Sequence, residues 1–340
     1  MATAHSLPPG PILLAGPTAV GKSDVALLLA EQLNGEIVSV DSMQVYRGLD
    51  IGTAKPSAEE RLRVPHHLID EVDLAEPFDA ARFLELARRA VAEIQSRNRL
   101  PILCGGTGLY FKAYVDGLGG APPSDERLRS ELETTPPGEL LRELAERDPV
   151  TFESIDRLNL RRVIRAVEVI RLTGKPFAAQ RAGWGERPRE PEGAGTSGPR
   201  LRGAEAAAVA QAGGRSPHQP VHAFGLMRGQ SDLRSRINDR VDAMFERGLV
   251  AETADLLKRG LGENRTAMQA LGYRQVVEHL REGRPLPETI ELVKIRTRQF
   301  AKRQMTWFKR QLRLEWVEWT PEASPASVAA LVRARMEMPG

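Results

Sequence analysis

Short apolar runs alternate with amphipathic segments over the first third of the chain. Buried strands are predicted at residues 12–15, 36–40, 67–70 and 101–104. Helices are predicted at residues 24–33, 79–97 and 109–114. Because strands that alternate with helices are typical of a parallel sheet covered by helices, we expect an α/β fold with a parallel sheet of the phosphate-loop type.

The pattern changes after residue 121. From 122 to 180 apolar positions recur at helical spacing, which predicts a helical insertion domain. Residues 181–220 are rich in glycine and proline and poor in large apolar side chains, so we expect a flexible linker there. Strand character then returns. The core is therefore expected to be split between 11–121 and 221–340.

The second part of the core is predicted to be mostly helical after its strand at 221–227. Helices are expected at 231–247, at 249–259, from 268 onward, and along a basic segment at 294–313. In that last helix Ala301, Met305, Phe308 and Leu312 would form the buried stripe. We expect Phe308 and its neighbour Trp307 to pack in the core.

Composition narrows the class of protein. With 41% apolar and 27% charged residues, the chain resembles an ordinary soluble protein, and its longest apolar run is too short to cross a bilayer. The first ten residues lack the features of a secretory signal. Cys104 is the single cysteine, which favours a reducing compartment, and we expect it to be buried and inert. We therefore expect a cytoplasmic protein, without membrane contact and monomeric.

Positive charge is concentrated near the C-terminus, although the net charge is only +3. Between residues 294 and 313 there are eight basic residues and no acidic one. Such a cluster is typical of a surface that follows a nucleic-acid backbone, and the alternative is a solvated helix face. Arg157, Arg161 and Arg165 share a second helix face in the insertion.

The first glycine-rich turn follows the strand at 12–15 and precedes a helix. It consists of Gly16, Pro17, Thr18, Ala19, Val20, Gly21, Lys22 and Ser23. This is the phosphate-loop pattern, in which backbone N–H groups and a lysine surround phosphate oxygens and the Ser hydroxyl can hold Mg²⁺. The sequence therefore predicts binding of a nucleotide such as ATP, or of another diphosphate.

Two further groups are expected at the same edge of the sheet. Asp41 directly follows the strand at 36–40, and the turn 105–108 follows the strand at 101–104. Ligands bind beyond the carboxyl ends of parallel strands, so Asp41 should face the phosphate loop. The strand at 101–104 ends in glycines rather than a metal-binding Asp, which weakens an ATPase interpretation but still allows a small-molecule kinase.

Several motifs together resemble the tRNA dimethylallyltransferases. They occur in order at 16–23, 39–46, 50–56, 65–67, 105–110, 272–275 and 302–307. The resemblance runs from about Pro11 to Trp307, and most of these motifs are more specific than the phosphate loop. The stretch at 181–220 is longer than the family normally carries at that crossing.

The resemblance implies a reaction and its residues. Dimethylallyl diphosphate would be bound by the phosphate loop with Mg²⁺ on Ser23, and the N6 amine of the adenosine just 3′ to the anticodon would attack its allylic carbon. Asp41 would be the general base, Thr18 would bond the bridging oxygen, and Arg240 would grip the diphosphate, with Arg236 as the alternative. His66 and His67 have no further ligands at metal-binding spacing, so we expect a structural role for them.

The resemblance also implies contacts with the anticodon stem-loop of tRNA. These are Asp41, Ser42, Met43, Gln44, Thr107, Arg129, Arg161, Arg162, Arg165, Gln269, Gly272, Tyr273, Arg274, Lys302, Arg303, Gln304, Trp307 and Lys309. Gln44 could read a base edge, whereas Thr107 could equally be a turn-forming residue. Three other functions remain open: a kinase, an RNA-binding protein whose loop senses a nucleotide, and a prenyltransferase acting on free adenine nucleotides.

Overall fold

The computed structural model describes residues 10–180 and 222–337. The chain divides into two compact units, one formed by residues up to Val115 together with the C-terminal part, and a second that begins at Asp116. The expected boundary after residue 121 thus lies just inside the second unit. The predicted linker at 181–220 lies outside the described residues.

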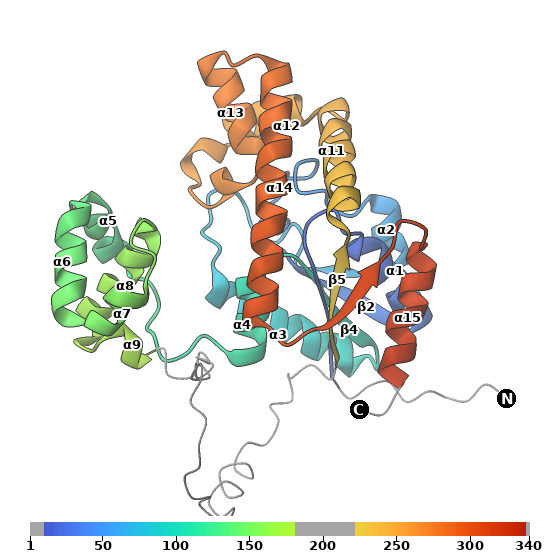
Figure 1. Ribbon diagram of the computed structural model, residues 1–340, viewed down its shortest axis with the longest axis horizontal. Helices are drawn as coiled ribbons and strands as arrows, with labels where there is room; N and C mark the ends of the chain where they lie inside the picture. The colour runs from blue at the N-terminus through green and yellow to red at the C-terminus, as the bar shows by residue number, and fades with distance from the viewer. Residues whose placement is uncertain (1–9, 181–221, 338–340) are drawn as a thin grey trace, which may run out of the picture. The chain divides into compact units, whose positions relative to one another are not determined.

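A six-stranded parallel sheet forms the centre of the first unit (Figure 1). Its strands are β1 (Ile12–Ala15), β2 (Gly35–Val40), β3 (His66–His67), β4 (Leu100–Gly105), β5 (His222–Arg228) and β6 (Glu315–Trp319). They lie in the order β3-β2-β4-β1-β5-β6. Strand β1 therefore lies between β4 and β5, with Leu14 opposite both Cys104 and Phe224. The α/β fold with a parallel sheet is confirmed.

Helices cover both faces of this sheet. The helices of the first unit are α1 (Lys22–Gln32), α2 (Ala58–Arg63), α3 (Ala80–Ser96), α4 (Gly108–Asp116), α11 (Gln230–Glu246), α12 (Leu249–Lys258), α13 (Tyr273–Glu282), α14 (Leu286–Gln311) and α15 (Pro325–Glu337). One face carries α1 and α15, which lie side by side over Ile12, Leu14 and Ile102. Alternate strand residues face the other side. There α3 packs across β2 and β4.

The second unit is entirely helical where it is described. Its helices are α5 (Glu126–Thr134), α6 (Pro137–Arg147), α7 (Pro149–Ser154), α8 (Leu160–Thr173) and α9 (Phe177–Gln180). Leu132, Leu144 and Val167 are fully buried in its own core. The apolar spacing at 122–180 correctly predicted helices with a common buried stripe.

Six elements differ from the sequence prediction. Strand β3 ends at His67 because Leu68 and Asp70 take left-handed backbone angles (φ 61 and 60). The helix expected from residue 268 begins only at Tyr273, after a short 3₁₀ turn at Ala267–Gln269. Helix α2 was not predicted, nor were β6 and α15. In α14, Gln304 is buried and Met305 only half-buried.

Among the helices of the described residues, none combines the length and the apolar character needed to cross a membrane.

Candidate active site at the carboxyl edge of the sheet

The phosphate loop joins β1 to the first turn of α1. Gly21 is the N-cap of α1 and has a left-handed backbone (φ 99), which glycine adopts without strain. The Lys22 ammonium donates a hydrogen bond to the Pro17 carbonyl at 2.8 Å, so the side chain curls back over its own loop. The strand, loop and helix setting required for a phosphate loop is present.

Two arginines from outside the loop bind its carbonyl groups. Arg228 at the end of β5 donates to the Val20 carbonyl at 2.8 Å, and Arg236 on α11 donates to the Ala19 carbonyl at 3.0 Å. The Trp319 ring lies between the Arg228 guanidinium, 3.9 Å from its centroid, and Gly21, where a Cβ would approach Trp319 Cζ3 to 2.5 Å. These contacts fix the carbonyl groups of the loop to β5, α11 and the end of β6.

Burial controls the charges beneath the loop. It lowers the pKa of Lys22 to about 8, although Cys104 and Asp41 oppose the shift. Burial also raises the pKa of the Cys104 thiol to about 11, so this cysteine stays protonated near neutral pH. The prediction that Cys104 is buried is therefore confirmed.

Asp41 lies at the carboxyl end of β2 in a tight turn. Its Oδ1 accepts hydrogen bonds from the backbone N–H of Met43 (2.8 Å) and of Gln44 (3.2 Å). The same turn is fastened to the glycine turn after β4, because the Thr107 hydroxyl accepts from the Ser42 N–H at 3.1 Å. No hydrogen bond from the described residues reaches Asp41 Oδ2. One carboxylate oxygen thus fixes the turn, and the other is available to a ligand.

Gln44 does not offer its amide to a ligand. Its Oε1 accepts from Ser39 Oγ at 2.8 Å, and its Nε2 donates to the carbonyls of Thr53 and Ala54 at 3.1 and 3.3 Å. These contacts use both ends of the carboxamide inside the protein. The expectation that Gln44 reads a base edge is not met in this conformation, and its side chain holds a loop instead.

Helices α11 and α14 complete the site from the other side. Arg240 on α11 is half-buried and has no hydrogen-bond or ion-pair partner among the described residues. Burial lowers its pKa while Asp41 and Asp24 oppose that shift, and an arginine stays charged in any case. Gln304 on α14 accepts from the Thr18 N–H and donates to the Gly106 carbonyl, each at 2.9 Å.

These groups surround a cavity of about 350 Å³. Its polar side chains come from Thr18, Asp41, Ser42, Thr53, Thr107, Arg240, Gln269, Thr297, Arg303 and Gln304, and Met43 and Gly52 lie among them. Its apolar wall contains Val241, Met244, Ala270, Leu271, Val293 and Phe300. The cavity therefore combines arginine and aspartate side chains with an apolar surface. Such a lining suits a ligand that has a charged head and a hydrocarbon part.

Several residues expected to touch RNA lie outside this cavity. Tyr273 is fully buried, and its hydroxyl donates to Glu252 (2.5 Å) and accepts from the Gly52 N–H (3.0 Å). Burial and the Glu252 carboxylate raise the pKa of Tyr273, so it remains a neutral phenol. The structure puts this ring in the interior, away from any RNA surface. Arg274, by contrast, is exposed and pairs with Glu278.

The aromatic residues of α14 pack as expected. Phe308 is fully buried and meets Phe111 edge to face. The ring of Trp307 lies against Gly108, where a Cβ would overlap it. Lys302 and Lys309 are exposed on the same helix.

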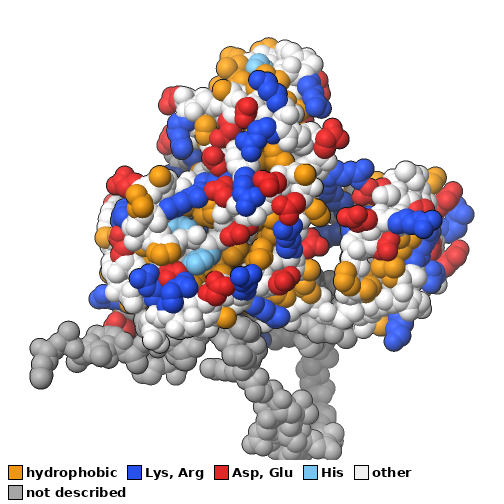
Figure 2. Space-filling model, turned by 180° about the vertical axis from the view of Figure 1, so that it is seen from behind, with side chains coloured by type: hydrophobic (Ala, Val, Ile, Leu, Met, Phe, Trp, Pro, Cys, Tyr) orange, Lys and Arg blue, Asp and Glu red, His pale blue; other side chains and the backbone are white. Residues whose placement is uncertain are grey.

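The charges of α14 are only partly neutralised. Lys294 pairs with Asp242 and Glu291, whereas Lys302 and Arg310 of α14, and Arg313 just after the helix, have no ion-pair partner among the described residues. Figure 2 shows a face of the molecule on which basic and acidic side chains are interspersed. The cations of α14 without an acidic partner in the described part of the chain, among them Lys302 and Arg310, remain available to bind an anion.

In the second unit, two of the four expected arginines serve the fold. The fully buried Glu168 accepts from Arg165 at 2.7 Å and lies 3.6 Å from Arg129. Arg161 and Arg162 are exposed, and their guanidinium groups have no hydrogen-bond or ion-pair partner within the described residues. These two are the arginines that remain available to bind phosphate.

The phosphate loop offers one candidate metal ligand, the hydroxyl of Ser23. No group of three or more His, Cys, Asp or Glu side chains among the described residues could hold a metal. Ser23 is exposed at the start of α1. A single hydroxyl suits Mg²⁺, which keeps several waters and is bound largely through substrate phosphates.

Sequence reasoning missed the apolar wall of the cavity, and it identified residues 48–56 as a loop without predicting that this loop holds Gln44. The wall comes from the residues that follow Arg240 and Gln269, and from one face of α14, so its parts are far apart in sequence. The only sign of this wall in the sequence was that apolar residues at helical spacing lie next to polar motif residues. The loop offered glycines and one lysine, with nothing to indicate burial.

The fold and the cavity define a phosphate-loop α/β protein whose site also holds a carboxylate and an apolar wall. Residues 44–311 match the IPP transferase family. The tRNA dimethylallyltransferase of Desulforudis audaxviator is 40% identical over 336 residues, which is 98% of this chain and 99% of that protein. The chain belongs to the IPP transferase family.

Solved structures agree with this assignment. The tRNA isopentenylpyrophosphate transferase of Bacillus halodurans shares 36% identity and a TM-score of 0.64, with 97% of each chain covered. A eukaryotic dimethylallyltransferase acting on tRNA shares 26% identity and a TM-score of 0.71, covering 96% of this chain and 77% of that one.

Proposed function

We propose that this protein transfers a dimethylallyl group from dimethylallyl diphosphate to N6 of the adenosine 3′ to the anticodon of tRNA. The single observation that carries the proposal is the composition of one cavity. Thr18 of the phosphate loop, Asp41 and Arg240 line it together with an apolar wall. Thr18 and Arg240 suit the diphosphate, and the apolar wall suits the allylic chain. Asp41 can accept the proton that the amine loses.

The phosphate loop and Arg240 would bind the diphosphate. Lys22, backbone N–H groups of the loop and the unpaired guanidinium of Arg240 would stabilise the charge that grows on the leaving group. Arg236 is already bonded to Ala19, which favours Arg240 as the residue that contacts the diphosphate. Thr18 lines the same cavity and could reach the bridging oxygen.

Asp41 would act as the general base. The adenine amine attacks the allylic carbon, the bond from that carbon to the diphosphate oxygen breaks, and diphosphate leaves. The proton lost from N6 passes to the free oxygen, Oδ2, of Asp41. Oδ1 is occupied by two backbone N–H groups, so the carboxylate meets the substrate in a fixed orientation.

Mg²⁺ would be held by Ser23 together with oxygens of the diphosphate and water. When bound, it neutralises part of the diphosphate charge and so makes the leaving group better. The protein's own contribution there is the Ser23 hydroxyl at the helix N-terminus.

Arg161 and Arg162 and the unpaired cations Lys302 and Arg310 support tRNA as the acceptor, because a mononucleotide would need none of them. The relative from the eukaryotic structure acts on tRNA. One cysteine and an RNA substrate support a cytoplasmic location. A monomer remains our prediction.

The test is incorporation of labelled dimethylallyl diphosphate, with Mg²⁺, into an anticodon stem-loop with adenosine just after the anticodon. A stem-loop with guanosine there and free AMP are the controls. We expect label only in the adenosine stem-loop. Transfer to AMP would indicate a free-nucleotide prenyltransferase, and no transfer together with ATP turnover would favour a kinase.

A further inference from the structure

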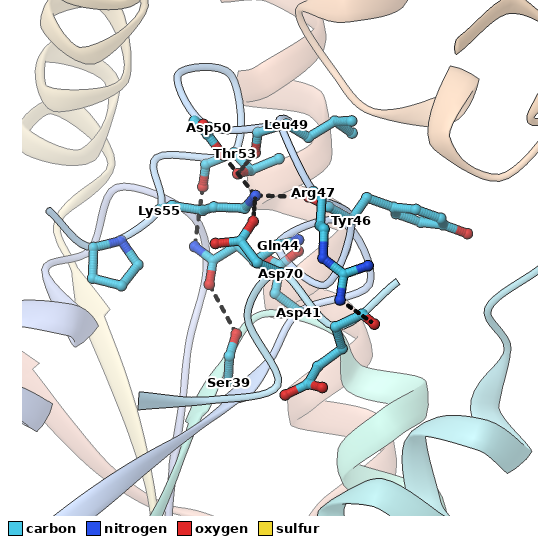
Figure 3. Close-up of polar contacts among 12 residues, drawn as sticks. Ser39, Asp41, Gln44, Tyr46, Arg47, Leu49, Asp50, Thr53, Lys55 and Asp70 are labelled. Carbon is cyan, nitrogen blue, oxygen red and sulfur yellow. Dashed lines mark hydrogen bonds and ion pairs between the residues drawn. The ribbon is translucent and has the colours of Figure 1, made fainter. Parts of the chain in front are cut away.

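Lys55 is a buried cation to which the reaction described above assigns no part. It lies in the loop between β2 and α2, and its side chain is 2% exposed. Its ammonium donates to the Tyr46 carbonyl (2.7 Å), to Asp50 (2.7 Å) and to Asp70 (2.5 Å). All three donors are therefore satisfied by groups of the protein (Figure 3).

Two carboxylates, Asp50 and Asp70, form ion pairs with the Lys55 ammonium. Partial burial would raise the pKa of Asp70, but hydrogen bonds from Lys55 and Arg61 outweigh that effect and lower it. Arg61 approaches Asp70 from the more exposed side at 2.8 Å. Because the Lys55 ammonium is buried, it depends on these two carboxylates and the Tyr46 carbonyl to replace the water it has lost.

Lys55 closes a ring of contacts around Gln44. Its carbonyl partner, Tyr46, lies two residues after Gln44, while the carbonyls that accept from the Gln44 amide, Thr53 and Ala54, directly precede Lys55. Figure 3 shows the Gln44 amide between Ser39 and this loop, below the Lys55 ammonium. The loop cannot move away without breaking contacts at both residues.

The same ring reaches Asp41. The backbone N–H of Gln44 is one of the two donors that hold Asp41 Oδ1, and the Gln44 carbonyl accepts from the Asp70 N–H at 3.2 Å. Asp41 is therefore oriented by a turn that ends at Gln44, and hydrogen bonds hold both the side chain and the backbone of Gln44. The backbone hydrogen bond is made by Asp70, which Lys55 binds, and the side-chain hydrogen bonds include those to the carbonyls of Thr53 and Ala54, the two residues before Lys55.

We propose that Lys55 is a positioning residue for Asp41, acting through the loop at 49–55 and Gln44. Lys55 acts without contacting the substrate, and this proposal rests on the proposed role of Asp41 as the general base. Lys55 sets the direction of the Asp41 carboxylate, and the geometry of proton removal depends on it.

The test is a double-mutant cycle on the single-turnover rate of transfer to the adenosine stem-loop. The proteins are the native chain, Lys55→Met, Asp41→Asn and the double variant. Lys55→Met is expected to lower the rate about 10- to 100-fold, because a misplaced catalytic group loses that much. In the Asp41→Asn background the same change should lower the rate by little, since the base it positions is already gone.

Arg61→Met is the matched control. It removes the other cation from Asp70 but none of the contacts to Tyr46 or Gln44, and its rate should stay near that of the native chain. Thermal melting checks that each variant is folded. If Lys55→Met does not fold, Gln44→Met replaces it in the cycle, because that change breaks the next contact in the same chain.

The outcomes separate the two proposals. An equal loss from Lys55→Met in both backgrounds would mean a general structural role, and a native rate in Lys55→Met would mean no role; either overturns the inference. A native rate in Asp41→Asn would remove the base and the positioning role together. A native chain without any transfer would instead refute the proposed function.

Discussion

The carboxamide of Gln304 accepts a hydrogen bond from the backbone N–H of Thr18 at 2.9 Å, which ties helix α14 to the phosphate loop. Its other end donates to the Gly106 carbonyl, so one side chain joins the turns that follow β1 and β4. Gln304 lies in a motif expected to contact tRNA. It is buried, and we propose that it positions the phosphate loop.

Replacing Gln304 separates these two roles. Gln304→Met should lower the free energy of unfolding by about 1–3 kcal/mol, because a buried donor and a buried acceptor lose their partners. It should raise KM for dimethylallyl diphosphate and leave Kd for tRNA unchanged. Gln299→Met, an exposed position on the same helix, is the control. A weaker tRNA complex with unchanged KM for the diphosphate would restore the RNA role.

Lys22 predicts how diphosphate binding depends on pH. Burial lowers its pKa to about 8, so the free site loses its cation as the pH rises through that value. Affinity for dimethylallyl diphosphate, measured by calorimetry between about pH 7 and pH 9.5, should therefore fall. Lys22→Arg keeps the charge and should flatten the dependence. The same slope in Lys22→Arg would show that another group is responsible.

The same shift has a consequence for stability. The pKa of Lys22 is about 8 in the folded protein and 10.5 for an unperturbed lysine, so between these values the unfolded chain binds more protons. The contribution of Lys22 to the free energy of unfolding should then increase as the pH rises from about 8 to 10.5. Urea unfolding of the native chain and of Lys22→Arg over this window measures the difference.

Arg240 and Arg236 lie one helical turn apart on α11 but differ in their partners. Arg240→Gln should raise KM for dimethylallyl diphosphate about 10- to 100-fold, the value of a lost charge-assisted contact. Arg236→Gln removes the bond to the Ala19 carbonyl and should mainly lower stability, by about 0.5–1.5 kcal/mol. Equal effects of the two changes on KM would contradict the assignment of Arg240 as the direct contact.

Much of the fold follows from local sequence. The strands β1, β2 and β4 are short, largely apolar segments followed by turn residues, and the pattern located all three. Helix α2 has no buried residue and therefore leaves no apolar stripe to detect. Strand β6 joins the sheet only beside β5, across a long helical crossover that no local pattern shows.

Sequence motifs predicted which residues belong to the site, but not how their side chains are arranged. Thr18, Asp41, Arg240 and Gln304 were all named from the sequence, and the structure brings them to one cavity. Their contacts were not predictable. Whether Gln44 faces a ligand or a loop depends on the Thr53 carbonyl, and the burial of Tyr273 depends on Glu252, a partner 21 residues away.

The most direct measurement is the single-turnover rate of Asp41→Asn with the adenosine stem-loop, together with its Kd for tRNA. The substitution keeps an oxygen for the N–H groups of Met43 and Gln44 but cannot accept the N6 proton. We expect the rate to fall about 10²- to 10⁴-fold, the range of a lost general base, with Kd nearly unchanged. A native rate, or a loss explained entirely by weaker tRNA binding, would contradict the account.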